Sequence, residues 1–217
     1  MKQTFLRKEF IQVHRRGNYC IQWIYLVVLL IGVVSLPAIA SPQGTGNNAS
    51  RATARRISDK ILLDGVMDEP VWRDTPSIGE IRQREPRENS EASERTEVRL
   101  LYDNDNFYVG VLCLDSDPAR ISGSQMARDG DLGADDTIEL LLDTFNDRRN
   151  GFYFATNPAG VLVDGLIIEN GQLNKDWDAI WNVHVRRSDQ GWSAEFAIPF
   201  KSLTFRDRKS TRLNSSH

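Results

Sequence analysis

Short apolar or alternating segments, separated by turn-forming residues, fill the chain from residue 57 to residue 206. In residues 96–102 apolar and polar side chains alternate, which is typical of a strand with one buried face, because successive side chains of a strand point to opposite sides. The unbroken apolar run at residues 107–114 is typical of a strand that is buried on both faces. No long stretch with helical periodicity interrupts this pattern, and residues 69–73, with Pro70 near their start, predict one short helical turn.

The complete pattern predicts eight or nine strands. Besides the two above, they lie at residues 60–64, 78–84, 137–143, 151–156, 161–169, 181–187 and 191–198. Turn signals at residues 103–106, 157–160 and 188–191 join consecutive strands. Many short strands of this kind bury their apolar faces by packing two sheets together. The sequence therefore predicts an all-β fold, an antiparallel β-sandwich of jelly-roll type with one or two short helical turns.

The beginning of the chain has the composition of a secretory signal. Residues 1–40 combine a basic start, an apolar run over residues 24–36, and the small residues Ala38 and Ala40, where a signal peptidase would cut. The run is shorter than the roughly 20 apolar residues that span a bilayer, and an uncleaved anchor is the alternative interpretation. We therefore expect an exported protein, located in the periplasm, in the outer membrane or outside the cell.

Two further segments flank the predicted sandwich. Residues 41–56 are rich in Ser, Gly, Asn, Thr and Ala, which predicts a disordered linker. Residues 207–217 match the translation of a common sequencing adapter. This match indicates a fragmentary gene, in which the natural protein continues past Arg206. The folded domain is accordingly assigned to residues 57–206.

Charge and composition exclude several classes of function. The whole chain has 27 Lys and Arg against 30 Asp and Glu, and the excess of acids grows once the basic leader is set aside. Such a domain lacks the cations that phosphate contacts require, so we expect no nucleic-acid partner. His14 lies in the leader and His217 in the adapter-like tail, which leaves His184 alone. A Ser-His-Asp triad or a histidine zinc site is therefore not expected.

Three motifs follow one another along the domain: LDGVMDEPVW at residues 63–72, DDTIELLLD at residues 135–143, and GWSAEFAIPF at residues 191–200. Together they resemble the family 9 carbohydrate-binding modules and their DOMON-like relatives, over residues 57–205. The resemblance implies a non-catalytic sandwich that holds sugar with a pair of tryptophans and carries structural calcium. A narrower resemblance is to the modules that begin large bacterial envelope proteins, and the segments that carry it are residues 82–87, 128–132 and 147–152.

A sugar site needs flat aromatic faces that stack on the pyranose ring and a few polar groups that fix its hydroxyls. Residues 176–182 (DWDAIWN) supply both kinds of group in a stretch that begins as a predicted loop. We expect Trp177 to stack on the sugar, with Asp176, Asp178 or Asn182 holding hydroxyls. Trp181 is the second aromatic candidate, although its place at the start of a strand also fits the core.

An acidic loop precedes the strand at residues 137–143. It carries Asp129, Asp131, Asp135 and Asp136. Carboxylates that converge repel one another unless they are solvated or bridged by a cation, and calcium prefers such oxygen ligands. The loop is therefore a candidate structural calcium site, with a solvated loop as the alternative, and no other cofactor is expected.

The function predicted from the sequence is a non-catalytic carbohydrate-binding module of an exported bacterial protein. Two alternatives stay open. One is a structural or interaction domain that precedes an outer-membrane β-barrel. The other is an accessory domain of a glycoside hydrolase whose catalytic part follows Arg206.

Overall fold

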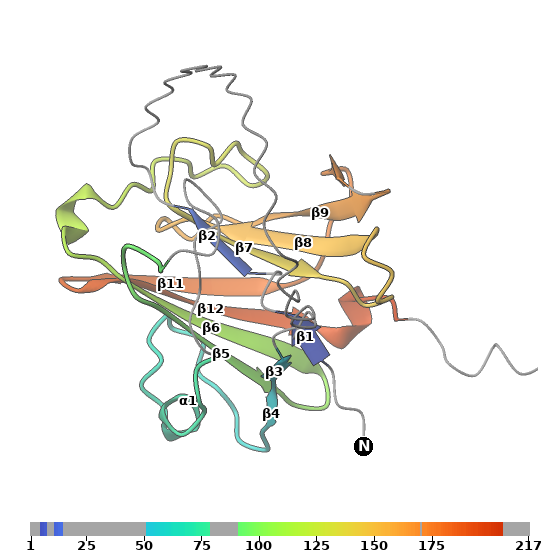
Figure 1. Ribbon diagram of the computed structural model, residues 1–217, viewed down its shortest axis with the longest axis horizontal. Helices are drawn as coiled ribbons and strands as arrows, with labels where there is room; N and C mark the ends of the chain where they lie inside the picture. Colours follow the sequence, from blue (N-terminus) through green and yellow to red (C-terminus); the bar gives the residue numbers. More distant parts are fainter. Residues whose placement is uncertain (1–4, 8–10, 15–50, 79–90, 170, 206–217) are drawn as a thin grey trace, which may run out of the picture.

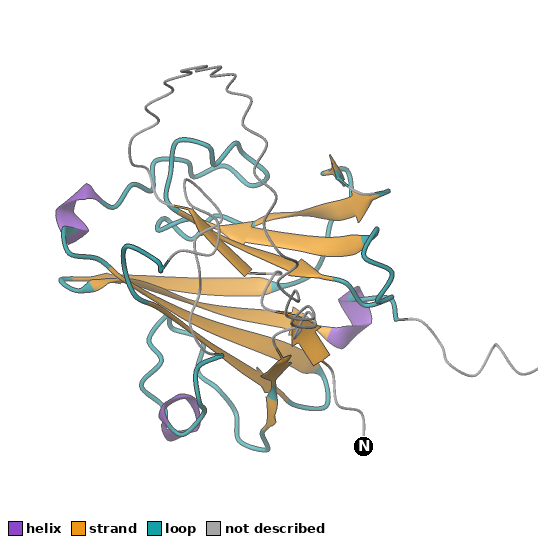
Figure 2. Ribbon diagram, in the orientation of Figure 1, coloured by secondary structure: helices purple, strands orange, loops and turns teal. Residues whose placement is uncertain are grey.

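Two five-stranded sheets pack face to face in the computed structural model, which describes residues 5–7, 11–14, 51–78, 91–169 and 171–205 (Figure 1). Helical structure in these ranges is limited to three short turns, α1 (Pro70–Arg73), η2 (Pro118–Arg120) and η3 (Phe200–Ser202) (Figure 2). Among the described residues no helix is long and apolar enough to cross a bilayer. The predicted β-sandwich with short helical turns is confirmed.

The first sheet has the order β11-β12-β6-β5-β4. Its strands are β4 (Arg55–Arg56), β5 (Thr96–Tyr102), β6 (Asn106–Leu114), β11 (Asn182–Ser188) and β12 (Gly191–Pro199). All neighbours pair antiparallel except β4, which runs parallel to β5. The inner strand β12 is buried from Gly191 to Ile198 because side chains cover both of its faces.

The second sheet has the order β10-β9-β8-β7-β2, with every pair antiparallel. Its strands are β2 (Ile11–His14), β7 (Thr137–Leu142), β8 (Gly151–Thr156), β9 (Val163–Ile168) and β10 (Gln172–Asn174). A separate two-stranded pair joins β1 (Phe5–Arg7) to β3 (Arg51–Thr53).

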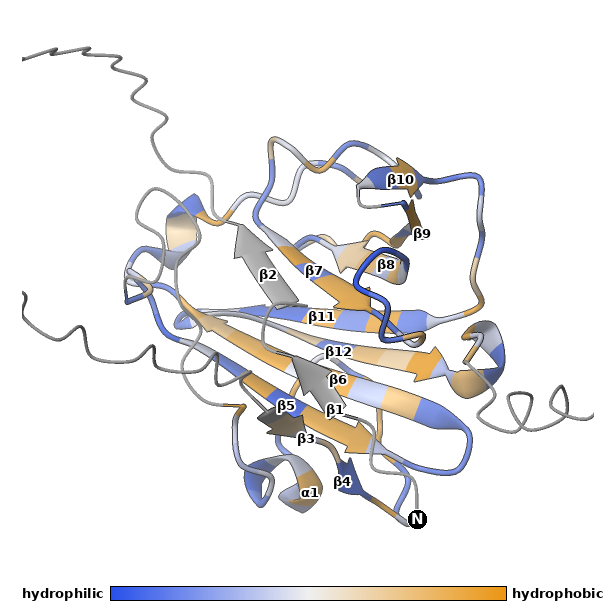
Figure 3. Cartoon of the chain, turned by 45° about the vertical axis from the view of Figure 1, so that its right-hand side comes forward, coloured by the Kyte–Doolittle hydropathy of each residue, from blue (hydrophilic) through white to orange (hydrophobic). Residues whose placement is uncertain are grey.

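The main core lies between the two sheets, where the strands are most apolar (Figure 3). Val98, Leu100 and Val111 of the first sheet and Leu140 and Phe154 of the second are at most 1% exposed. A smaller cluster covers the outer face of the first sheet. It consists of Ile57, Trp72, Leu101, Tyr108 and Ala197. The second cluster explains why β6 is apolar on both faces, as its sequence predicted.

The first and third sequence motifs form one structural unit on that outer face. Glu195 of β12 is fully buried, and its Oε2 accepts the backbone N–H groups of Asp64 and Gly65 at 3.0 and 2.8 Å. Its Oε1 accepts the indole N–H of Trp72 at 2.7 Å. Gly65 has φ +86°, and a Cβ there would lie 2.6 Å from the carbonyl carbon of Val185. Glycine is therefore required where the chain turns onto the carboxylate.

The stability of this unit is expected to fall as the pH rises from about 4.5 to about 7. Burial raises the pKa of Glu195 from 4.5 to about 7, with a smaller contribution from the charge of Glu69, and outweighs the three N–H donors. In this interval the unfolded chain has lost the proton that the folded domain retains. The free energy of unfolding then falls by up to about 1.4 kcal/mol per pH unit.

Urea denaturation at several pH values measures this dependence, and Glu195→Gln, which cannot ionise, should flatten it. An equal slope in wild type and Glu195→Gln would assign the pH dependence to other groups. Asp135 acts in a separate, more acidic interval. Burial raises its pKa, but donors from Ser124, Gln125 and Asn157 outweigh burial and hold the pKa below 3.8.

Two predicted segments differ from the structure, and a third lies mostly outside the described residues. Residues 60–64 were expected to be a strand, but they form a loop, because side-chain carboxylates accept their backbone N–H groups: Glu69 binds Leu62 and Glu195 binds Asp64. Residues 51–56 were assigned to the linker, yet they contain β3 and β4. The strand expected at residues 78–84 falls mostly in residues 79–90, outside the described ranges.

The ends of the chain bear on two further predictions. Strands β1 and β2 lie inside the predicted leader, residues 1–40, whose other residues are outside the described part. The signal peptide and its cleavage stay predictions. The tail at residues 207–217 is likewise outside the described ranges.

Candidate functional site

Trp177 lies on the loop between β10 and β11 and differs from the other described tryptophans in its exposure. Trp72, Trp181 and Trp192 are at most 3% exposed, whereas Trp177 is only partly buried at the margin of the core. Its ring contacts Phe152, with centroids 5.2 Å apart, and Phe154, with centroids 6.2 Å apart. These two rings come from β8, so the sheet holds the indole in place while part of it reaches solvent.

Trp181, the second predicted stacking residue, is a core residue. It is 3% exposed, and its ring stacks on Phe196 at 5.8 Å with an interplanar angle of 3°. Phe154 meets it edge-on at 5.2 Å. Because these rings cover it, Trp181 has no free face for a sugar, and its proposed role in stacking is corrected to packing.

A buried carboxylate fixes the loop that carries both tryptophans. Asp164 of β9 is fully buried. Its Oδ1 accepts the indole N–H of Trp181 at 3.0 Å, and its Oδ2 accepts the backbone N–H of Ala179 at 2.6 Å. Oδ1 also accepts from Nη2 of Arg128 at 2.6 Å. A buried charge must be paired to persist, and Asp164 obtains all three donors from chain segments outside its own strand.

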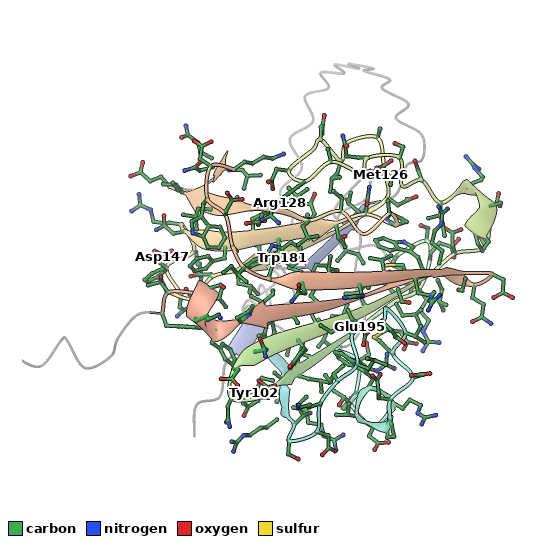
Figure 4. All side chains as sticks on the ribbon, turned by 180° about the vertical axis from the view of Figure 1, so that it is seen from behind. Tyr102, Met126, Arg128, Asp147, Trp181 and Glu195 are labelled. Carbon is green, nitrogen blue, oxygen red and sulfur yellow. The ribbon has the colours of Figure 1, made fainter. Side chains whose placement is uncertain are left out.

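Arg128 joins the acidic loop to the tryptophan loop. Besides Asp164, its Nη2 reaches Oδ1 of Asp178 at 3.4 Å and the carbonyl oxygen of Ala179 at 3.5 Å. Its Nε lies 3.3 Å from Oδ2 of Asp129. Arg128 and Trp181 lie close together in Figure 4, and both donate to the same oxygen of Asp164. The surface beside Trp177 is thus formed by two loops, and Asp164 of β9 holds them together from beneath.

The polar residues predicted to hold the sugar lie on two different elements near Trp177. Asp176 and Asp178 are exposed on the same loop, and the side chain of Asp178 is 76% exposed. Asn182 is exposed at the start of β11, after Trp181. The structure adds Arg128 and Asp164, which the sequence analysis missed. The one available signal was Asp164 itself, a single acid inside the apolar segment VLVDGLII at residues 161–168.

The four aspartates of the acidic loop do not form a joint metal site. Across the ranges that the structure describes, no three His, Cys, Asp or Glu side chains group closely enough to hold a metal ion. Asp129 pairs with Arg128, and Asp131 accepts the N–H of Gly133 within its own turn. Asp136 accepts the N–H of Ser122.

Asp135 is the most strongly bound of these aspartates. Its oxygens accept from the hydroxyls of Ser122 and Ser124, from the backbone N–H groups of Ser124 and Gln125, and from the amide of Asn157. These donors supply the compensation that a cation was expected to give. The second sequence motif therefore begins with a structural carboxylate that ties residues 122–125 to Asn157, in the turn after β8.

Comparison with known proteins identifies the family of the domain. The family model described as "Carbohydrate family 9 binding domain-like" matches residues 63–214. No curated protein matches the chain. Two solved structures of family 9 carbohydrate-binding modules from Caldicellulosiruptor kristjanssonii are similar. The module in complex with cellotriose has 15% identity and a TM-score of 0.45, covering 67% of this chain and 66% of that one.

The module in complex with glucose has 16% identity and a TM-score of 0.44, covering 67% of this chain and 69% of that one. The family match includes the two motifs that meet at Glu195 and the loop that carries Trp177. It spans most of the chain. This chain therefore belongs to the carbohydrate family 9 binding domain-like family.

Proposed function

We propose that the domain is a non-catalytic carbohydrate-binding module whose sugar site is centred on Trp177. The observation that carries the proposal is the exposure of this indole, since the other described tryptophans are buried. A ring held by Phe152 and Phe154 loses little conformational freedom when a sugar stacks on it. Family membership supports carbohydrate as the class of ligand.

Polar groups beside Trp177 supply hydrogen bonds of both kinds. The carboxylate of Asp178 accepts from hydroxyls, and Asp176 offers a second exposed carboxylate. The side chain of Arg128 is 42% exposed, and its guanidinium donates. Asp164 is fully buried and already accepts three hydrogen bonds, so it positions the loop rather than acting on the ligand. The proposed mechanism is ring stacking with hydroxyl recognition and no bond cleavage.

Trp177→Ala is expected to weaken saccharide binding by about tenfold or more, because stacking and the buried ring area are lost together. Calorimetric titration with glucose and with cellotriose measures the loss, and tryptophan fluorescence follows the same binding in the wild type. Trp177→Phe keeps a ring and should retain part of the affinity.

Phe205→Ala is the matched control, since Phe205 is an exposed aromatic residue, 45% exposed, outside the Trp177 loop. It should bind as the wild type does. A wild-type domain that binds neither glucose, cellotriose nor other oligosaccharides would overturn the proposal. Equal binding by Trp177→Ala and wild type would move the site elsewhere on the domain.

The exported location expected from residues 1–40 belongs to the same proposal. Polysaccharides that such a module would bind lie outside the cytoplasm, which agrees with a secretory leader. Fractionation of cells that express the chain, followed by mass spectrometry of its N-terminus, tests the location and the cleavage after Ala40. Sequencing the gene in its source would show whether the module is part of an envelope protein with a barrel or of a glycoside hydrolase.

A further inference from the structure

We propose that Asp164 makes the Trp177 surface selective for uncharged saccharides over anionic ones, by neutralising Arg128 from beneath. The inference rests on the sugar site proposed above and names the class of ligand that this site takes. An arginine at a sugar-binding surface is an obvious receptor for carboxylate or sulfate groups, because its planar fork donates to two oxygens at once. Arg128 could bind an anionic sugar in this manner only if its donors were free of carboxylates of the protein.

The geometry shows that Arg128 is already engaged on two sides. Nη2 donates to the buried Oδ1 of Asp164 at 2.6 Å, the shortest of its contacts. Nε lies 3.3 Å from Asp129, and Asp178 is 3.4 Å from Nη2. A carboxylate such as Asp164, which is fully buried, is screened little by water and holds its partner strongly. An incoming anion would have to compete with this internal one.

The charges of the neighbouring side chains also disfavour an anionic ligand. Asp176 and Asp178 are exposed on the Trp177 loop, and Lys175 is the second cation, with its Nζ 3.4 Å from the carbonyl oxygen of Asp129. The two cations Arg128 and Lys175 are outnumbered by the carboxylates of Asp129, Asp164, Asp176 and Asp178 in these segments, which leaves an excess of negative charge. A uronate or a sulfated sugar would meet repulsion there, whereas a neutral sugar would not.

Coulomb's law gives the order of magnitude of the effect. One uncompensated charge about 6 Å from a ligand anion, in a dielectric between that of a protein surface and water, changes affinity by about threefold to tenfold. We therefore expect wild-type protein to bind glucose at least about threefold more tightly than glucuronate. Raising the salt concentration should strengthen glucuronate binding by screening the repulsion and leave glucose binding unchanged.

Competition titration of the wild-type chain with glucose and glucuronate, at low and at high salt, is the first test. Glucuronate binding that equals or exceeds glucose binding would overturn the inference while leaving the sugar site standing. Glucuronate binding that weakens with salt would overturn it as well, since this is the behaviour of a free arginine receptor. Absence of binding by every saccharide would overturn the proposed function itself.

Asp164→Asn is the second test, because it removes one charge and keeps the shape of the side chain. Arg128 would then be incompletely neutralised, and glucuronate should gain about threefold to tenfold relative to glucose. Asp189→Asn removes an exposed carboxylate in the turn between β11 and β12 and should leave the ratio unchanged. An unchanged ratio in folded Asp164→Asn would refute the role of Asp164. The salt test on wild type decides the question if that variant does not fold.

Discussion

Glu195→Ala is expected to lower the free energy of unfolding by about 3–5 kcal/mol, a large part of the stability of a domain of this size. Three donors, the N–H groups of Asp64 and Gly65 and the indole of Trp72, would lose their common acceptor. Each buried donor left unpaired costs about 1–3 kcal/mol. The cost of these unpaired donors exceeds the free energy gained by no longer burying a carboxylate. The cavity left by the side chain adds to the cost, because the cluster around Trp72 encloses it.

Urea denaturation at pH 7 measures this effect, with Glu91→Ala as the control for the loss of an exposed glutamate. The control should change stability by less than about 0.5 kcal/mol. The contact with Trp72 can be isolated by a double-mutant cycle between Glu195→Gln and Trp72→Phe, which should show coupling. Loss of less than about 1 kcal/mol in Glu195→Ala would mean that the donors find water, and that the opening motif is not held by this carboxylate.

The strands of the sandwich could be predicted because their signal is local. Residues 96–102 and 151–156 were predicted with the bounds that the structure gives to β5 and β8. The signal was alternation in the first segment and a short apolar run before a turn in the second. The loop at residues 60–64 could not be predicted in this way. Its apolar residues resemble a strand, but the backbone N–H of Asp64 is satisfied by Glu195, 131 positions further along the chain.

The candidate site shows the same division. Trp177 stood out because two acids flank it in the sequence, and its partial exposure agrees with that expectation. Asp164 and Arg128 were missed because their relation is spatial: they are 36 positions apart, Asp164 belongs to no motif, and the segment at residues 128–132 was noted only for its resemblance to a family. Trp181 was the second candidate in the same stretch, although its place at the start of a strand already fitted the core. The packing of Phe196 and Phe154 against its ring shows that it is a core residue.

Asp164→Ala is expected to destabilise the domain by about 3–5 kcal/mol and to disorder the loop that carries Trp177. The substitution leaves the indole of Trp181 and the N–H of Ala179 without their acceptor, and it removes the counter-charge of Arg128. The two donors left unpaired cost about 1–3 kcal/mol each, whereas Arg128 adds less because its side chain is 42% exposed and can be solvated. Saccharide affinity should fall with stability, since Asp164 positions the loop without being exposed itself.

Two measurements separate the stability effect from the effect on the site. Hydrogen exchange should show the amide of Ala179 losing protection in Asp164→Ala, even under conditions in which the strands β11 and β12 stay protected. Arg128→Ala removes the other partner and leaves the carboxylate of Asp164 buried, so it should also destabilise the domain strongly. The double variant, Asp164→Ala with Arg128→Ala, should lose less stability than the sum of the two single losses. Additive losses in the double variant would show that the two residues act separately, and that the Trp177 loop is held by the core rings alone.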